Sequence, residues 1–408
     1  MKKILHIVNE LNVGGSETVL YRQLLALQDQ AYTFYVIVLS KPGYYSEPIK
    51  NLGIPIYYLA INKTNILKAL YQLITLIKKI EPDIVQTWLY HSDFLGGLCA
   101  KFCGVKKIIW GIRCEGVQLK PTTKWVKRGC ALLSWIVPNF IITNSQAALH
   151  QHSRTGYQSR KMQIIYNGFD TELFAPQPVR HPEHPVRHPE RSEGSPTHDT
   201  VPESRRSLAT LGMTYRISGM TCERVAAYLP ENALLIGTLA RFHQDKDYPN
   251  LIQAIDTVCA LHDNVYFLFC GQDCDDNNLQ LNSMLTTLTY RNRVILLGKT
   301  DNAASYLNQL NIFILSSQTE SFPNCLGEAM ACGLACIATD VGEARVLLGD
   351  TGLIVPPNDP TQLASACLTM LNKSENARTQ NGVAARQRIK KHYSIAQHKQ
   401  QIQALYES

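Results

Sequence analysis

The sequence predicts an α/β protein built from two doubly wound domains that face each other across a cleft. Three observations support this prediction. The chain has 408 residues, short apolar runs alternate with longer segments of helical period, and this alternation occurs twice. A chain of this length contains about two or three domains. Strands that alternate with helices form parallel βαβ units with helices on both faces of the sheet.

The first half contains a series of strand-like runs. The first extends from Ile4 to Val8, and a turn at Gly14-Gly15 and a helical segment from about Glu17 to Leu27 follow it. Further strands are expected at 34–39, 56–59, 84–87, 107–110 and 140–143, with a helix over 66–79 that ends before Pro82. We expect residues 1–175 to form the N-terminal domain.

The same pattern returns after about residue 230. Short buried strands are expected at 234–239, 265–270, 294–297, 312–315, 336–339 and 353–355. We expect residues 225–385 to form the second domain, and residues 386–408 to form a helix that packs back on the first.

A polar segment over residues 180–221 separates the two halves. It repeats the phrase His-Pro-Glu and contains almost no aliphatic residues before Leu208. Such a segment cannot bury enough apolar surface to offset the entropy lost on ordering. We therefore expect a disordered insertion or linker here.

Composition argues against several classes of protein. No apolar run reaches the roughly 18 residues that a membrane span needs, and the apolar stretch after Lys2-Lys3 is too short for a signal peptide. The 12 cysteines are scattered and lack the paired spacing of zinc ligands, so we expect no metal site and a cytoplasmic location. A net charge of +7 does not indicate a nucleic-acid partner.

The stretch from Lys101 to Trp135 combines basic residues with tryptophan. Eight basic residues and a single acid, Glu115, lie between Lys101 and Arg128. One interpretation is a patch that contacts a membrane surface. The other is a core helix with a solvated basic face.

The clearest functional signal is the phrase SSQTESFPNCLGEAMACG at residues 316–333. It follows a buried strand, begins a helix at Pro323-Asn324 and ends at Gly333. Loops at the carboxyl ends of parallel strands bind ligands, and the free amides of a helix start favour an anion such as a diphosphate. The candidate binding residues at this helix start are Phe322, Pro323, Asn324, Cys325 and Leu326.

Two carboxylates eight residues apart, Glu320 and Glu328, flank this turn. Each can accept hydrogen bonds from hydroxyl groups, so a sugar on one side and a ribose on the other fit this spacing. Taken singly, Glu328 is better explained as a residue that complements the helix dipole, and Glu320 as a solvated side chain.

This phrase resembles the Glu-x7-Glu motif of retaining glycosyltransferase family 4, which has the GT-B fold of two facing Rossmann-like domains. The resemblance covers nearly the whole chain apart from the insertion. It implies that Glu320 contacts the donor sugar and that Glu328 holds the nucleotide ribose. The segment 237–247 also resembles the family, and it implies that Arg241 and Lys246 clamp the donor diphosphate. Two cations in these places stabilise the leaving group, so neither a metal nor another cofactor is required.

Further segments resemble the same family. Gly14-Gly15-Ser16-Glu17 is similar to its Gly-Gly-Ala-Glu loop, where we expect Gly15 to approach the ligand closely. Residues 338–343 match a segment beside the nucleotide, residues 144–145 and 167–170 match supporting landmarks, and Gly271 is a further candidate for donor binding.

Two positions after neighbouring strands bear on the acceptor. His91 follows the strand at 84–87, where members of the family carry functional histidines; acceptor binding and a structural role are both open. Arg113 stands where many relatives have histidine. A subgroup that shares the phrase Gln-Thr-Trp-x-Tyr-His and this arginine acts on lipid-linked glycans.

The resemblance implies transfer of a hexose or N-acetylhexosamine from a UDP- or GDP-sugar to a glycan or lipid-linked acceptor in cell-surface polysaccharide synthesis, at the inner face of the membrane. A glycosidase needs an acid and a second carboxylate across the scissile bond, and a dinucleotide-dependent oxidoreductase needs a GxGxxG turn, which the sequence lacks. A catalytically impaired protein that binds nucleotide-sugars is the remaining alternative.

Overall fold

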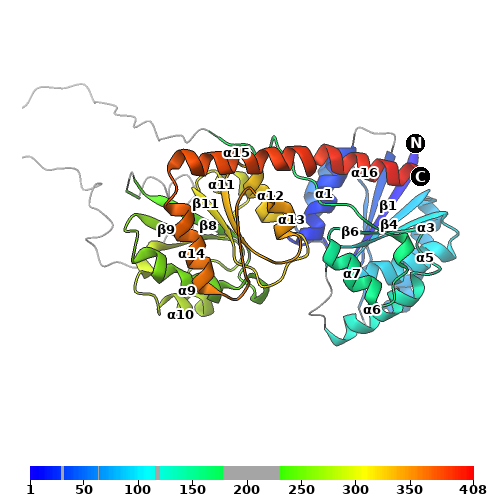
Figure 1. Ribbon diagram of the computed structural model, residues 1–408. Helices are drawn as coiled ribbons and strands as arrows, with labels where there is room; N and C mark the ends of the chain where they lie inside the picture. Colours follow the sequence, from blue (N-terminus) through cyan, green and yellow to red (C-terminus); the bar gives the residue numbers. More distant parts are fainter. Residues whose placement is uncertain (29–31, 63, 115–119, 178–228, 231) are drawn as a thin grey trace, which may run out of the picture.

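The computed structural model describes residues 1–28, 32–62, 64–114, 120–177, 229–230 and 232–408. It contains two sheets whose strands pair in parallel throughout, one in each half of the chain, side by side in Figure 1. The prediction of two doubly wound α/β units is confirmed. The segment 180–221, which we expect to be an insertion, lies outside the described residues.

The N-terminal sheet has seven strands in the order β3-β2-β1-β4-β5-β6-β7. The strand order reverses between β1 and β4, and ligands bind at such a switch point in open α/β sheets. The short strand β7 was not predicted, because three residues with a central glutamine give no apolar run. The strands are β1 (Lys2–Val8), β2 (Tyr32–Val38), β3 (Ile56–Tyr58), β4 (Ile84–Trp88), β5 (Lys107–Ile112), β6 (Phe140–Thr143) and β7 (Met162–Ile164).

Side chains of β1 alternate between two buried layers, as a strand covered on both faces requires. Ile4 and Val8 belong to the core beneath α1 and α16, whereas Leu5 and Ile7 belong to the core beneath α3 and α5. The helices of this half are α1 (Gly15–Leu27), α2 (Ser46–Asn51), α3 (Ile66–Ile80), α4 (Leu89–His91), α5 (Gly97–Phe102), α6 (Pro121–Leu133) and α7 (Gln146–Arg154).

The C-terminal sheet has six strands in the order β10-β9-β8-β11-β12-β13. Each lies within one residue of the predicted range: β8 (Leu234–Leu239), β9 (Val265–Cys270), β10 (Val294–Gly298), β11 (Ile312–Leu315), β12 (Ala335–Thr339) and β13 (Leu353–Val355). Its helices are α9 (Tyr248–Cys259), α10 (Leu279–Leu285), α11 (Ala303–Leu307), α12 (Asn324–Ala331), α13 (Ala344–Leu348) and α14 (Pro360–Leu371).

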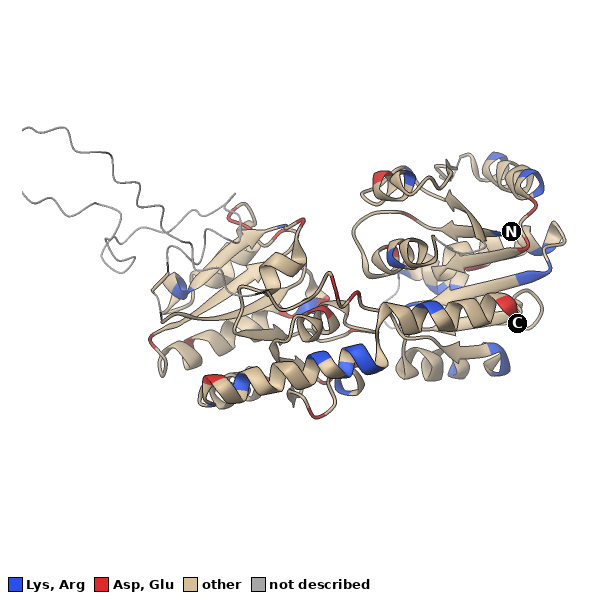
Figure 2. Ribbon diagram, turned by 90° about the horizontal axis from the view of Figure 1, so that it is seen from above, with Lys and Arg blue, Asp and Glu red and all other residues tan. Residues whose placement is uncertain are grey.

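Two further helices, α15 (Glu375–His392) and α16 (Ile395–Glu407), run along both halves and bring the C-terminus beside the N-terminus (Figure 1). α15 packs on α12 and α16 packs on α1. α15 ends at His392, and the Ser394 hydroxyl caps α16 by accepting from the Gln397 amide at 3.3 Å. Basic residues occupy the last turn of α15 (Figure 2), where they complement the helix dipole.

Among the described residues the chain crosses between the halves twice, and these two crossings are hydrogen-bonded to each other. The Phe169 amide donates to the Tyr393 carbonyl at 2.9 Å, and the Ile395 amide donates to the Phe169 carbonyl at 2.8 Å. Gly168 allows this approach, since a side chain there would overlap Ile395 and His398. None of the helices in the described part of the chain is both long and apolar enough to span a bilayer.

Candidate functional site

A cavity of about 410 Å³ lies between the two halves. Its walls come from loops that follow β1, β4, β5, β6 and β7 on one side and β11 on the other, which are carboxyl ends of parallel strands. The lining residues are Asn9, Gly15, Ser16, Leu89, Tyr90, His91, Arg113, Cys114, Thr123, Asn144, Asn167, Glu320, Ser321, Phe322 and Asn324.

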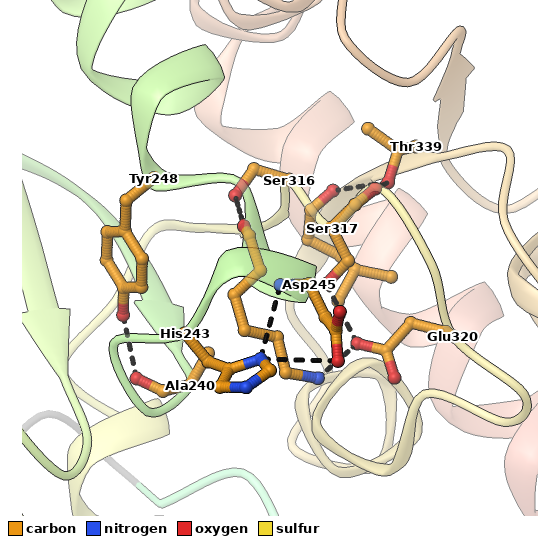
Figure 3. Close-up of polar contacts among 10 residues, drawn as sticks. Ala240, His243, Asp245, Tyr248, Ser316, Ser317, Glu320 and Thr339 are labelled. Atoms are coloured by element: carbon orange, nitrogen blue, oxygen red, sulfur yellow. Dashed lines mark hydrogen bonds and ion pairs between the residues drawn. The ribbon is translucent and has the colours of Figure 1, made fainter. Parts of the chain in front are cut away.

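Lys246 and Glu320, which the sequence placed in one site, form an ion pair of 2.5 Å. Ser317 donates a second hydrogen bond to the same Glu320 oxygen at 2.8 Å (Figure 3). Lys246 ends a short 3-10 turn (Gln244–Lys246) after β8, and Glu320 lies in the loop after β11. Adjacent parallel strands thus bring together two residues that are 74 positions apart in the sequence.

Three hydrogen bonds join these two loops. Ser316 donates to the Lys246 carbonyl at 2.9 Å, the Gln318 amide to the Asp245 carbonyl at 2.9 Å, and the Gln318 side chain to the Gln244 carbonyl at 2.7 Å. Thr339 of β12 adds a bond of 2.6 Å to the Ser317 carbonyl. Side chains on loops joined in this way are held in place before any ligand arrives.

The environment keeps Lys246 charged. Burial alone would lower its pKa, but the Glu320 carboxylate outweighs this effect and the pKa is raised. A cation held in a partly dry site interacts more strongly with a developing negative charge than a lysine in water does.

The start of α12 lies next to this ion pair. The amides of Leu326 and Gly327 are the first to find an acceptor within the helix, since both donate to the Pro323 carbonyl. The preceding amides, those of Asn324 and Cys325, have no intrahelical acceptor. The Leu326 and Phe322 side chains are buried in the core; Phe322 also lines the cavity, whereas Leu326 does not. Gly342 packs directly against the backbone of the Glu320 loop. A side chain at this position would overlap the Glu320 carbonyl.

Glu328 does not line the cavity, and its carboxylate is paired with Arg22 of α1 at 2.5 Å. Both side chains are largely buried, and the contact joins the two halves. The sequence does not indicate that Arg22 has a role in this site, because it is one of several polar residues on an amphipathic helix. Its partner becomes visible only when α1 and α12 are brought together.

Arg241 and Gly271 lie at the ends of β8 and β9. Arg241 is exposed, and its charge opposes the burial that raises the pKa of Glu17 in α1, so it faces the N-terminal half. Gly271 has φ of +149°, and a side chain there would overlap the Ala240 carbonyl. Gly271 therefore lets two loop backbones pass closely and so sets the position of Arg241.

The opposite wall carries Gly15, His91 and Arg113. A methyl group on Gly15 would lie 3.4 Å from the side-chain Nδ2 of Asn324, so Gly15 approaches the first residue of α12 closely. His91 is half-buried and its pKa is lowered by burial, which favours the neutral imidazole. The candidates from the sequence that do not line the cavity are Arg241, Lys246, Gly271, Pro323, Cys325, Leu326 and Glu328.

Models of two protein families match the two halves of the chain. Residues 13–173 match Glycosyltransferase Family 4, and residues 233–373 match Glycosyl transferases group 1. The chain belongs to glycosyltransferase family 4. Enzymes of this family retain the anomeric configuration of the transferred sugar.

Individual relatives are similar to this family 4 chain over different lengths. The Bacillus anthracis N-acetyl-alpha-D-glucosaminyl L-malate synthase is 34% identical over 30% of the chain and 32% of its own length. An Escherichia coli UDP-Gal:alpha-D-GlcNAc-diphosphoundecaprenol alpha-1,3-galactosyltransferase is 22% identical over 99% and 96%. Anabaena HepE in complex with UDP and glucose shares the fold, with a TM-score of 0.77, 19% identity and full coverage of both chains.

Further contacts between the halves of this family 4 protein were not predicted from the sequence. Ser321 donates to Asn144 at 2.8 Å, and Glu343 accepts from the Gln146 amide at the start of α7 at 2.5 Å. Ser321, Asn144 and Glu343 lie in segments identified by their resemblance to the family, whereas Gln146 directly follows one of them. Their pairing was not predicted, because it depends on how the two sheets face each other.

A buried carboxyl group, Asp93, fixes the loop that carries His91. Asp93 is completely inaccessible to solvent, and one of its oxygens accepts from Thr87 of β4 at 2.5 Å. Burial raises its pKa well above the ordinary value, against the hydrogen bonds from Thr87 and the Gly111 amide. The folded protein thus favours the protonated carboxyl group.

We expect Asp93→Asn to increase stability relative to wild type, by an amount that grows with pH. The unfolded chain loses this proton at the ordinary pKa and the folded chain at a higher one, so the wild-type free energy of unfolding falls as pH rises between the two values. Asparagine keeps an oxygen for Thr87 and cannot ionise. Urea unfolding at pH 5, 6.5 and 8 measures the difference, with the exposed Asp263→Asn as control. A difference that is the same at all three pH values would contradict this account.

Proposed function

We propose that this family 4 protein transfers a hexose or N-acetylhexosamine from a UDP- or GDP-sugar to a glycan or lipid-linked acceptor in cell-surface polysaccharide synthesis. The observation that carries the proposal is the Lys246–Glu320 pair, which lies beside the start of α12 at a cavity shared by both halves. The complex of HepE with UDP and glucose and the diphosphoundecaprenol in the name of the E. coli relative support the choice of donor and acceptor.

In the proposed reaction, the bond from the anomeric carbon to the donor phosphate breaks and a bond to the acceptor oxygen forms on the same face. The acceptor proton passes to a phosphate oxygen of the leaving diphosphate. Lys246, Arg241 and the α12 amides stabilise the charge on that diphosphate, and Glu320 orients the donor sugar through its hydroxyls. In this scheme Glu328 holds the ribose, and Arg22 orients the Glu328 carboxylate from α1.

A panel of UDP- and GDP-sugars tests the donor. A ligand that binds only the folded protein raises the melting temperature. Sugars linked to the correct nucleotide, UDP or GDP, should therefore raise the melting temperature, and those linked to the other nucleotide should not. Turnover with the best donor is then compared between wild type and Glu320→Ala. Measurable turnover in wild type that falls in the variant supports the enzyme, whereas equal near-zero rates would favour an impaired nucleotide-sugar-binding protein.

We also place the protein in the cytoplasm, at the inner face of the membrane, through α6. Trp125, Leu132 and Ile136 of this region are 70%, 78% and 66% exposed, and Lys124 and Arg128 of α6 are exposed as well. An apolar row flanked by cations fits a bilayer with anionic head groups. A core helix with a purely basic exposed face does not fit these exposures.

We expect Leu132→Ser/Ile136→Ser to reduce the affinity for anionic liposomes, measured by cosedimentation, by about 30-fold or more, since each side chain contributes about 1–2 kcal/mol when buried in lipid. Wild-type binding should weaken as salt rises. Leu279→Ser, which changes an 83% exposed leucine on α10, is the control and should bind as wild type does. Absence of wild-type cosedimentation at low salt would rule out this surface.

A further inference from the structure

Arg113 is fixed in the cavity wall by two neighbours. It follows β5, and its guanidinium carbon lies 4.5 Å from the centre of the Trp88 ring. Its Nη1 donates to Asn167 Oδ1 at 2.5 Å, and Asn167 in turn donates to Asn324 at the start of α12 at 2.8 Å. The planar group is thus held in one orientation at the cavity that Arg113 lines.

No carboxylate neutralises this cation within the described part of the chain. Arg113 takes part in none of the ion pairs there, its Nε is buried without a hydrogen-bond partner, and Nη2 makes no hydrogen bond to a described residue. Burial lowers the pKa of Arg113 to about 9, so the group stays charged at neutral pH. A largely buried cation without a negatively charged neighbour is costly, and an anionic ligand would remove this cost.

The groups that face Arg113 from α16 do not supply the missing charge. Burial and the charge of Arg113 lower the pKa of His398 to about 4, which leaves the imidazole neutral. Tyr406 is fully buried with a pKa raised by burial, so it is also neutral. Across the cavity, the lining carboxylate Glu320 is already paired with Lys246.

We propose that Arg113 binds an anionic group, a phosphate or a carboxylate, of a ligand in this cavity, and that the acceptor brings this group. Nη2 of this cavity-lining residue presents N–H donors that can form a charge-assisted hydrogen bond to an oxygen of such a group. The cations and helix start of the C-terminal half already serve the donor diphosphate, so the anion on the opposite wall belongs to the second substrate. This inference rests on the proposed function, which it narrows to acceptors with an anionic group near the reacting hydroxyl.

Calorimetric titration with pyrophosphate tests the subsite without turnover. The protein is first saturated with UDP, or with GDP if only GDP binds, so that the donor diphosphate site is filled. We expect pyrophosphate to bind to wild type and to the exposed control Arg154→Gln alike, and at least about 10-fold more weakly to Arg113→Met, which keeps an apolar side chain against Trp88 but loses the charge-assisted hydrogen bonds. Thermal melting of each variant shows that it is folded.

The outcomes separate the two sources of the anion. If nucleotide-saturated wild type binds no pyrophosphate but Arg113→Met weakens UDP binding about 10-fold, Arg113 holds the donor diphosphate and the anion site stands with that ligand. If Arg113→Met alters neither the binding of UDP nor that of pyrophosphate, the proposal is overturned. If wild type binds neither UDP nor GDP, the donor proposal fails, and titration of the free protein still decides the role of Arg113.

Discussion

Replacing Lys246 with methionine should lower kcat for sugar transfer by about 10²- to 10³-fold, the loss usual when a fixed charge that stabilises a transition state is removed. The Glu320 carboxylate raises the pKa of Lys246, and hydrogen bonds between the loops after β8 and β11 hold the lysine in place. In the proposed reaction its charge meets a diphosphate whose negative charge grows as the anomeric bond breaks. The loss should therefore fall on kcat more than on the KM for the donor.

Two comparisons separate this effect from loss of structure. Lys299→Met removes an exposed lysine that lies 3.8 Å from Asp301, and it should leave kcat within about two-fold, since surface ion pairs contribute little. Lys246→Met leaves Glu320 without its cation in a partly buried site, so melting temperature is measured in parallel. A folded Lys246→Met protein with wild-type kcat would contradict the role assigned to the lysine.

The fold was predictable because its evidence is local. Each strand of the C-terminal sheet is a short apolar run, and β11 is followed by a turn and Pro323-Asn324, which begin a helix through their backbone preferences. The Lys246–Glu320 pair was predictable only by combining the strand pattern with the family resemblance. Loops after adjacent parallel strands meet at one edge of the sheet, and the resemblance to family 4 indicated which side chains meet there.

The contacts between the halves were not predictable from local pattern. Arg22 and Glu328 are 306 positions apart, and nothing in the helical period of α1 indicates that its arginine will meet α12. The isolation of Arg113 is a similar case. The sequence showed an arginine where relatives have histidine, but only the packing of Trp88, Asn167 and α16 around it shows that the chain supplies no counter-charge among its described residues.

Gly327→Ala should destabilise the protein by about 1–3 kcal/mol, although helix propensity alone favours alanine by about 1 kcal/mol. Gly327 lies inside α12, and a β-carbon there would lie 2.5 Å or less from atoms of the Phe169 ring. Phe169 is fully buried, and its backbone is hydrogen-bonded to the second crossing. The ring therefore cannot swing away, and overpacking outweighs propensity.

A double-mutant cycle with Phe169→Leu identifies the cause. The smaller side chain makes room for the methyl group, so the two substitutions together should cost at least about 1 kcal/mol less than the sum of their separate effects in urea unfolding. If the two changes in the free energy of unfolding are additive, the methyl group clashes with a group other than the Phe169 ring.

The same cycle links stability to catalysis. The Phe169 ring also stacks on Phe322, with centroids 6.0 Å apart, and Phe322 precedes the start of α12 by two residues. A methyl group on Gly327 would push α12 away from Phe169 and shift the amides of Asn324 and Cys325 relative to Lys246. We therefore expect kcat to fall in Gly327→Ala and to recover partly in the double variant. Recovery of stability without recovery of kcat would show that the position of α12 matters to folding but not to transfer.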